Sequence, residues 1–102
     1  GKSGGLFKAK RIVQLAEAAG MEVQLGGFLE SRLAWTAVAH LAGISPAIRY
    51  FDMDTPLMFT TDPVVGGMRY LPGGVIQLPG AQPGLGAAVR TEMAGPATVV
   101  QP

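Results

Sequence analysis

The sequence predicts an α/β fold, in which two helices and two parallel strands alternate as a slice of a larger sheet or barrel, followed by a β-rich segment. Helical and strand-like stretches follow one another with connections of a few residues, which is typical of parallel βαβ units. From Pro56 onward no helical period reappears and prolines become frequent. A parallel sheet of two strands cannot cover its own edges and faces. We therefore expect further strands upstream.

The first predicted helix covers residues 6–19. Its apolar residues recur at intervals near 3.6, and lysine, arginine, glutamine and glutamate supply most of the polar face. Gly20 stands where a C-terminal glycine cap belongs. Residues 21–25 then predict a short strand, which ends at Gly26 and Gly27.

The second predicted helix covers residues 30–41. It has an apolar body, Ser31 or Glu30 near its start, and Gly43 as its stop. After Pro46 the run of residues 48–52 predicts the second strand.

The C-terminal part carries turn and hairpin signals. Two short strand-like runs, residues 68–71 and 75–78, flank Pro72-Gly73-Gly74, which predicts a β-hairpin. A further turn at residues 84–86 precedes a short strand through Val89. We expect residues 91–102 to form a disordered tail.

Composition excludes several classes of protein. The 102 residues carry a net charge of +1 with scattered basic residues, so we expect no nucleic-acid or membrane-surface partner. The absence of cysteine excludes disulfides and thiolate metal sites and fits a cytoplasmic protein. No apolar run reaches the roughly 20 residues of a membrane span. The chain starts at Gly1 without an initiator methionine, and we expect it to be a piece of a longer protein.

Lys2 is the first candidate for catalysis. It lies with glycines directly before the first predicted helix, and barrel enzymes place catalytic groups at the ends of strands, where such loops begin. The alternative is a solvated loop lysine. Gly1-Lys2-Ser3 also matches the end of a phosphate-binding P-loop, G-x-x-x-x-G-K-[ST], although only three positions can be compared.

Two further groups follow the predicted strands. Asp52 and Asp54 flank Met53, and residues two apart on a strand face the same side, so both carboxylates could bind one ammonium group or hard metal ion. The alternative is ordinary turn chemistry before a proline. Gly26, Gly27 and Phe28 follow the first strand, where glycine lets a ligand approach the backbone. A plain connecting loop is the alternative there.

In series, these residues resemble the C-terminal end of the mandelate racemase and muconate lactonizing enzyme group of the enolase superfamily. The similarity is closest to muconate-lactonizing-type members and dipeptide epimerases, and it runs from residue 2 to about residue 90. The matching segments are residues 2–6 (KSGGL), 16–21 (AEAAGM), 26–31 (GGFLES), 39–42 (AHLA), 52–56 (DMDTP), 62–67 (DPVVGG) and 84–86 (GLG).

The resemblance implies a (β/α)7β barrel, similar to a TIM barrel, capped by an α+β domain. Residues 1–56 would be its last βα units, with the chemistry-bearing residues at the ends of strands six to eight. Residues 57–90 would return as a β-rich segment whose hairpin packs on the capping domain. Residues 91–102 would be the disordered tail.

The resemblance also implies a chemistry, in which Mg²⁺ stabilises the enolate formed when a proton α to a carboxylate is removed. Lys2 matches one of two lysines that act as acid and base, and Asp52 and Asp54 match a pair that binds a substrate ammonium. Gly26, Gly27 and Phe28 would line the substrate. The metal ligands would lie upstream, so no metal ligand is expected in this chain.

We therefore expect a small-molecule carboxylate substrate and an epimerase or racemase of a dipeptide or amino acid derivative. A muconate-type cycloisomerase or a dehydratase of the same superfamily is the alternative. A catalytically inert structural fragment and a truncated P-loop nucleotide binder are alternatives of another class. We expect the isolated chain to be inactive without the N-terminal part of its own enzyme, and the full-length enzyme to be a homo-oligomer.

Overall fold

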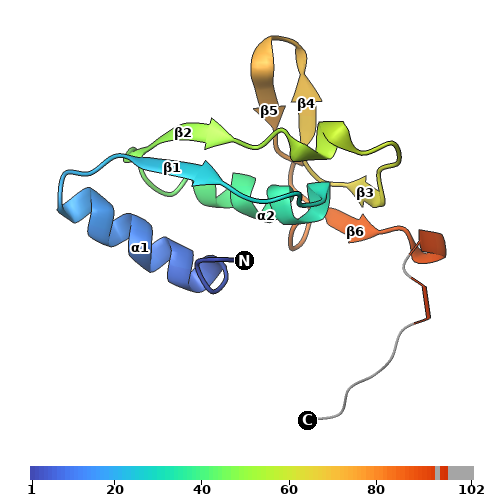
Figure 1. Ribbon diagram of the computed structural model, residues 1–102, viewed down its shortest axis with the longest axis horizontal. Coiled ribbons are helices and arrows are strands. Elements are labelled where there is room, and N and C mark those ends of the chain that lie inside the picture. The colour runs from blue at the N-terminus through green and yellow to red at the C-terminus, as the bar shows by residue number, and fades with distance from the viewer. Residues whose placement is uncertain (94, 97–102) are drawn as a thin grey trace.

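The first half of the molecule is a pair of parallel strands covered on one side by two helices (Figure 1). The computed structural model describes residues 1–93 and 95–96. Its elements are α1 (Leu6–Ala18), β1 (Val23–Gly26), α2 (Arg32–Ala42) and β2 (Ile48–Asp52). The predicted order of helix, strand, helix and strand is therefore confirmed.

Local chemistry explains where α1 ends and β1 begins. Gly20 has a φ of +69°, and its amide donates to the Glu17 oxygen while the Met21 amide donates to the Ala16 oxygen. These two bonds form a Schellman cap, which satisfies the last carbonyls of the helix. Because the Met21 amide is used by this cap, β1 starts at Val23, two residues later than predicted.

The helix α2 begins at Arg32, two residues later than predicted. The amide of Glu30 is used by the preceding loop, where it donates to the Phe28 oxygen. Glu30 therefore belongs to the loop after β1. Ser31, one of the two predicted starting residues, is the N-terminal cap position.

A first buried cluster joins the helices to the strands. It consists of Val13 from α1, Leu25 from β1, Leu41 from α2 and Ile48 from β2. These four side chains are 2–8% exposed. Because its four members are apolar, the cluster itself stabilises this half through the burial of apolar surface.

The second half consists of four short strands in two antiparallel pairs. β3 (Val64–Gly66) pairs with β6 (Ala87–Val89), and β4 (Arg69–Leu71) pairs with β5 (Val75–Gln77). The β4–β5 hairpin, which projects away from the rest of the molecule in Figure 1, confirms the hairpin prediction. The predicted tail, residues 91–102, lies mostly outside the described residues; Thr91–Met93 forms a short 3-10 turn.

A second buried cluster connects the two halves. Trp35 and Ala39 of α2, Met53 after β2, and Met68 before β4 pack together, and both Trp35 and Met68 are fully buried. This cluster places the C-terminal strands against the end of β2. Within the described part of the chain, no helix has both the length and the apolar character needed to cross a membrane.

Candidate functional site at the carboxyl ends of the parallel strands

The carboxyl ends of β1 and β2 form one rim of the molecule. The strands run parallel, and Gly26 at the end of β1 is the register partner of Asp52 at the end of β2. A Cβ atom placed on Gly26 would lie 3.9 Å from the Cβ atom of Asp52. Ligands of parallel α/β folds bind at such ends, because the loops there are free to carry functional groups.

Lys2 reaches the same rim from the loop that precedes α1. Its Nζ atom lies 4.1 Å from the centre of the Phe28 ring, in cation–π geometry. Lys2 also lines a hollow of about 250 Å³, together with Gly26 and Gly27. Both Lys2 and Phe28 are exposed to solvent. The structure therefore brings four of the predicted site residues together.

Gly27 is required by the packing of the loop after β1. A Cβ atom at this position would come within 2.9 Å of the Trp35 ring, which is too close for any side chain. Since Trp35 is fully buried in the second cluster, its ring has little room to move. Glycine here allows the loop to lie directly on the indole.

The hydroxyl of Thr55 joins the loops after β1 and β2. Its Oγ1 atom accepts hydrogen bonds from the Trp35 indole nitrogen at 2.7 Å and from the Glu30 amide at 3.3 Å, and it donates to the Glu30 oxygen at 3.2 Å. One donor and two acceptor positions are all that a hydroxyl offers. Every position on Thr55 is therefore used to hold the two loops in fixed relation.

The acidic pair is placed differently from the prediction. Asp52 is the last residue of β2, but Asp54 lies beyond the strand, with φ −98° and ψ −11°. The backbone turns because the Leu57 amide donates to the Asp54 oxygen at 2.9 Å, which opens the 3-10 turn Thr55–Met58. The expectation that both aspartates lie on one strand was wrong, and Asp54 takes the turn that the sequence offered as the alternative.

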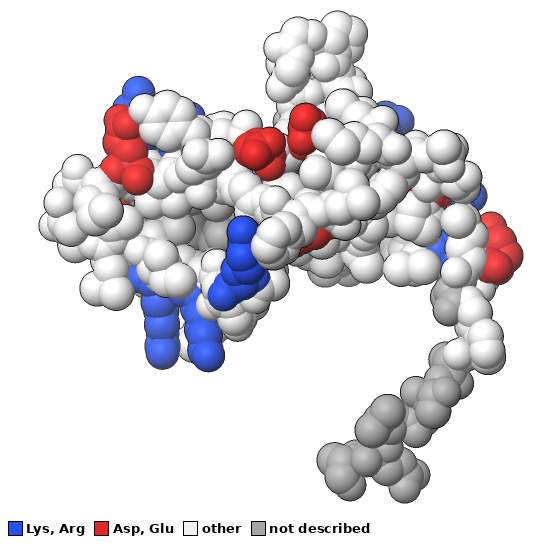
Figure 2. Space-filling view, viewed as in Figure 1, with Lys and Arg blue, Asp and Glu red and all other residues white. Residues whose placement is uncertain are grey.

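The two aspartates nevertheless flank one buried residue. Met53, the residue between them, is 5% exposed, whereas Asp52 and Asp54 are exposed. In Figure 2, acidic side chains gather near the end of β2, and a basic side chain lies on the same face near the N-terminal segment.

Tyr70 of β4 contacts this part of the chain, and sequence reasoning missed it. Its hydroxyl donates to the main-chain oxygen of Met53. Burial, and then the negative charge of Asp54, raise the pKa of Tyr70 to about 12. Tyr70 is therefore a neutral hydrogen-bond donor at ordinary pH.

Arg32 at the start of α2 is a second residue that the sequence did not reveal. Its guanidinium donates to the carboxylate of Asp62 at 2.6 Å, to the main-chain oxygens of Val64 at 2.6 Å and Met68 at 2.9 Å, and to the oxygen of Gly66. A planar guanidinium suits such a set of acceptors, because its donors are fixed in a fork. No local signal marks this contact, since 30 to 36 residues separate the partners.

The rim offers an ammonium and two carboxylates but no evident metal site. Among residues 1–93 and 95–96, no group of three or more histidine, cysteine, aspartate or glutamate side chains could hold a metal ion. A hard cation such as Mg²⁺ needs more oxygen ligands than this acidic pair provides. The residues present therefore fit an organic cation better than a metal.

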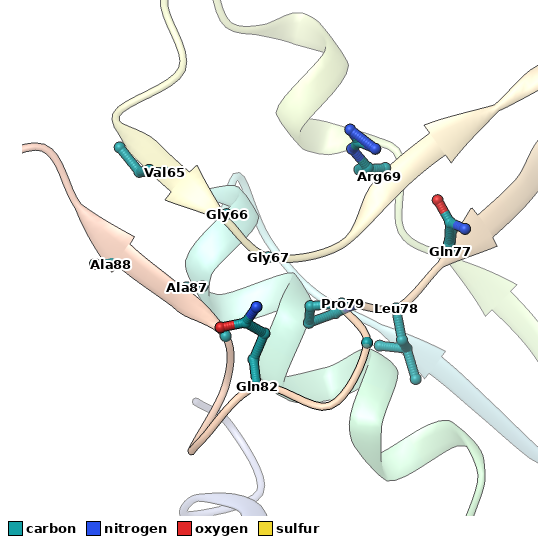
Figure 3. A pocket seen from close by; sticks show the side chains of 12 residues that line it. Val65, Gly66, Gly67, Arg69, Gln77, Leu78, Pro79, Gln82, Ala87 and Ala88 are labelled. Atoms are coloured by element: carbon teal, nitrogen blue, oxygen red, sulfur yellow. The ribbon is translucent and has the colours of Figure 1, made fainter.

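A larger hollow of about 680 Å³ lies elsewhere, between the β3–β6 and β4–β5 pairs (Figure 3). It is lined mainly by glycine, alanine and other apolar residues, and Arg69 is its one charged lining residue. None of the predicted site residues lines it. Size alone therefore does not identify the functional site of this chain.

The fold and the rim together define the C-terminal end of a parallel α/β barrel of the enolase type. Residues 1–93 match the family model described as Enolase C-terminal domain-like, and the chain belongs to this family. The predicted resemblance and the predicted fold class are therefore confirmed. Because the match includes Gly1-Lys2-Ser3, these residues are part of the enolase-type domain and the P-loop alternative loses its basis.

Individual relatives agree with this family. The chain is 53% identical over 91 residues to the D-Ala-D/L-Ala epimerase of Cytophaga hutchinsonii, covering 89% of this chain and 24% of that protein. It is 35% identical over 101 residues to the N-succinyl-L-Arg/Lys racemase of Bacillus cereus, covering 98% and 26%. The chain thus spans about a quarter of the length of these relatives.

A solved structure shows the same arrangement of elements. The crystal structure of the dipeptide epimerase from Cytophaga hutchinsonii, complexed with Mg and the dipeptide D-Ala-L-Val, superimposes with a TM-score of 0.82 at 52% identity. The similarity covers 87% of this chain and 24% of that one.

Proposed function

We propose that these residues form the C-terminal part of an enzyme that epimerises or racemises a dipeptide or amino acid derivative by removing the proton α to a carboxylate. The observation that supports this most is that Lys2 lines a hollow with Gly26, the register partner of Asp52, in a chain 53% identical to a D-Ala-D/L-Ala epimerase. We call the longer protein the complete enzyme.

Lys2 is one of two acid/base groups in this proposal. In one direction its amine takes the α proton from one face of the substrate, and the second lysine, expected upstream in the complete enzyme, delivers a proton to the opposite face. In the reverse direction the Lys2 ammonium delivers the proton and the second lysine takes it. Phe28 lies against Nζ at 4.1 Å and limits the positions that the amine can adopt. Gly26 and Gly27 leave room for the substrate beside the backbone.

Asp52 and Asp54 bind the substrate ammonium. Two carboxylates favour a cation, and an exposed pair can exchange its hydration for a charge-assisted hydrogen bond at modest cost. The pair therefore favours a substrate with a free α-amine, which is protonated at neutral pH. The N-succinyl-Arg or N-succinyl-Lys named for the Bacillus cereus racemase has no α-ammonium, so only its side-chain cation could bind this pair.

The metal belongs to other residues of the complete enzyme. When bound, Mg²⁺ would stabilise negative charge on the substrate carboxylate. Because the described residues offer no ligand set, we assign none of them to the metal.

The organisation of the chain follows from the same proposal. Residues 1–56 would be the last βα units of the barrel, and residues 57–90 the segment that returns to a capping domain. Many large apolar side chains are exposed on the outer side of α1 and on β2, including Phe7, Leu15 and Phe51, which fits contact with further parts of the complete enzyme. The expected homo-oligomer stays a prediction, for light scattering to test.

The test is α-proton exchange in the complete enzyme with Mg²⁺ in deuterated water, for a panel of dipeptides and N-acylated amino acids. We expect deuterium at the α carbon and inversion of configuration, and a drop in rate of roughly 10²–10⁴-fold for Lys2→Ala. Lys10→Ala, which alters an exposed lysine on α1, is the matched control and should keep its rate.

The same assay can refute the proposal. If none of these substrates exchanged its α proton, the epimerase and racemase proposal would be wrong. A cyclised or dehydrated product would point to the cycloisomerase or dehydratase alternative instead. For Asp52→Asn and Asp54→Asn we expect KM for free-amine dipeptides to rise about tenfold or more, because one charge-assisted bond is lost.

A further inference from the structure

Tyr70, on the β4–β5 hairpin, reaches the acidic pair from the C-terminal half of the chain. Its hydroxyl donates to the main-chain oxygen of Met53, the residue between the two aspartates. We propose that Tyr70 is a positioning residue, which holds the peptide group between Met53 and Asp54 and so sets the direction of the Asp54 carboxylate toward the substrate ammonium. This inference rests on the proposed function.

Met53 is held at two points. Its side chain packs against Trp35 and Met68 in the second cluster, and its carbonyl is held by Tyr70. Asp54 follows the Met53 carbonyl directly, so a rotation of this peptide group would swing the Asp54 side chain. Without the phenol, the Met53 carbonyl would lose its hydrogen bond, and the packing of the Met53 side chain and the turn that follows would be left to oppose that rotation.

The chain just before Tyr70 is held by contacts with α2. Two residues before it, Met68 is fully buried, its amide donates to the Thr36 hydroxyl at 3.0 Å, and its oxygen accepts from Arg32 at 2.9 Å. Thr36 and Arg32 both belong to α2. Through these contacts α2 fixes the position of the hairpin, and the hairpin in turn fixes the peptide group between the aspartates through the Tyr70 hydroxyl.

A phenol suits this place because it is neutral. Burial, and then the negative charge of Asp54, raise the pKa of Tyr70 to about 12, so the hydroxyl keeps its proton. A lysine or arginine here would donate a similar bond but would add a positive charge that competes with the substrate ammonium for Asp54.

Tyr70→Phe in the complete enzyme tests the proposal, because it removes the hydroxyl and keeps the ring. We expect KM for a free-amine dipeptide to rise about 5–10-fold while kcat stays within about 2-fold, as for a loss of uniform binding. Amide hydrogen exchange of Leu57, which donates to Asp54, should become about 5–10-fold faster, because the turn loses its neighbouring support.

Tyr50→Phe is the matched control. It also removes one phenol hydroxyl, but that hydroxyl binds the Glu22 carboxylate at 2.6 Å and not the peptide between the aspartates. We expect neither KM nor the Leu57 exchange rate to change by more than about 2-fold, since the acidic pair keeps its support.

Two results would overturn the inference. One is a Tyr70→Phe enzyme with unchanged KM and unchanged Leu57 exchange. The other is a fall in kcat at constant KM, which a general structural defect would give. If the wild-type enzyme exchanged no dipeptide proton, the proposed function would fail, and Leu57 exchange alone would decide whether Tyr70 holds this peptide group.

Discussion

The two buried clusters of the molecule differ in the interactions that surround them. The first, around Leu25 and Ile48, contains only apolar side chains and joins the helices to the strands. The second, around Trp35 and Met68, is surrounded by specific hydrogen bonds, from the Trp35 indole to Thr55 and from the Met68 amide to Thr36. The first cluster requires only suitable volume, whereas the second also requires particular donors and acceptors.

This difference corresponds to what each cluster supports. The first contains Ile48 at the start of β2 and Leu25 one residue before the end of β1, and none of its four residues is proposed to act on the substrate. The second contains Met53, between the two aspartates, and Trp35, on which the Gly27 loop lies. Directional bonds are thus concentrated where the position of a functional group depends on them.

The largest expected effect is on Trp35. Trp35→Leu removes much of a fully buried ring and leaves the Thr55 hydroxyl with an unused acceptor position, so we expect a loss of about 3–5 kcal/mol in unfolding free energy. Leu25→Ala in the first cluster should cost about 2–4 kcal/mol. Urea denaturation of the complete enzyme measures both.

Measuring the substrate affinity of both variants would test this difference between the two clusters. Near-native substrate affinity in the folded fraction of Leu25→Ala, together with weakened affinity in Trp35→Leu, would support the distinction between the clusters. Equal losses of affinity in both variants would contradict it.

A second prediction concerns Arg32. Arg32→Lys keeps the charge but cannot reach Asp62 and three main-chain oxygens at once, so we expect a loss of about 2–3 kcal/mol in unfolding free energy. Arg49→Lys, at an exposed position on β2, is the control and should change the value by less than about 0.5 kcal/mol. If the two variants were equally stable, Arg32 would not hold the C-terminal segment.

Two glycines offer a matched third comparison. Both Gly67 and Gly73 have positive φ, +76° and +79°, so alanine is strained at each. A Cβ atom on Gly67 would also lie 2.6 Å from the Thr36 hydroxyl, whereas nothing lies within 4 Å of one on Gly73. We expect Gly67→Ala to cost about 2–3 kcal/mol and Gly73→Ala about 1 kcal/mol in thermal denaturation; equal costs would exclude the contact with Thr36.

The smallest effect is a change of stability at alkaline pH. Because the pKa of Tyr70 rises from 10.0 to about 12 on folding, the unfolded chain loses this proton first. Its contribution to stability is complete below pH 10 and is lost as pH rises toward 12. Tyr70→Phe should therefore lose less unfolding free energy over that interval, as measured by urea titrations at several pH values. An identical pH profile would mean that Tyr70 is not buried as described.

The local elements could be predicted from the sequence because their signals are local. Apolar spacing indicates α1, the Gly20 cap gives its end, and Pro72-Gly73-Gly74 gives the hairpin. The errors at the starts of β1 and α2 arose where an amide was taken by a neighbouring cap or loop, at Met21 and Glu30. Periodicity does not carry that information.

The rim could be predicted only in part. Lys2, Gly26 and Asp52 follow or precede predicted elements, so topology alone brings them together. Tyr70, Thr55 and Arg32 act over distances of 17 to 36 residues in sequence, and nothing in their local context marks them. The turn at Asp54 was one of two alternatives that the sequence left open, since an aspartate before Thr55-Pro56 is compatible with a turn as well as with a continued strand.

Thr55 has a consequence for how such enzymes diversify. Because one hydroxyl serves the loop that carries Phe28 and the loop that carries the aspartates, neither loop can be reshaped alone. A substitution that widens the first loop for a bulkier side chain would also displace the carboxylates. Under the proposed function, a change in preference for substrate size would therefore also alter the binding of the substrate ammonium, unless Thr55 changed as well.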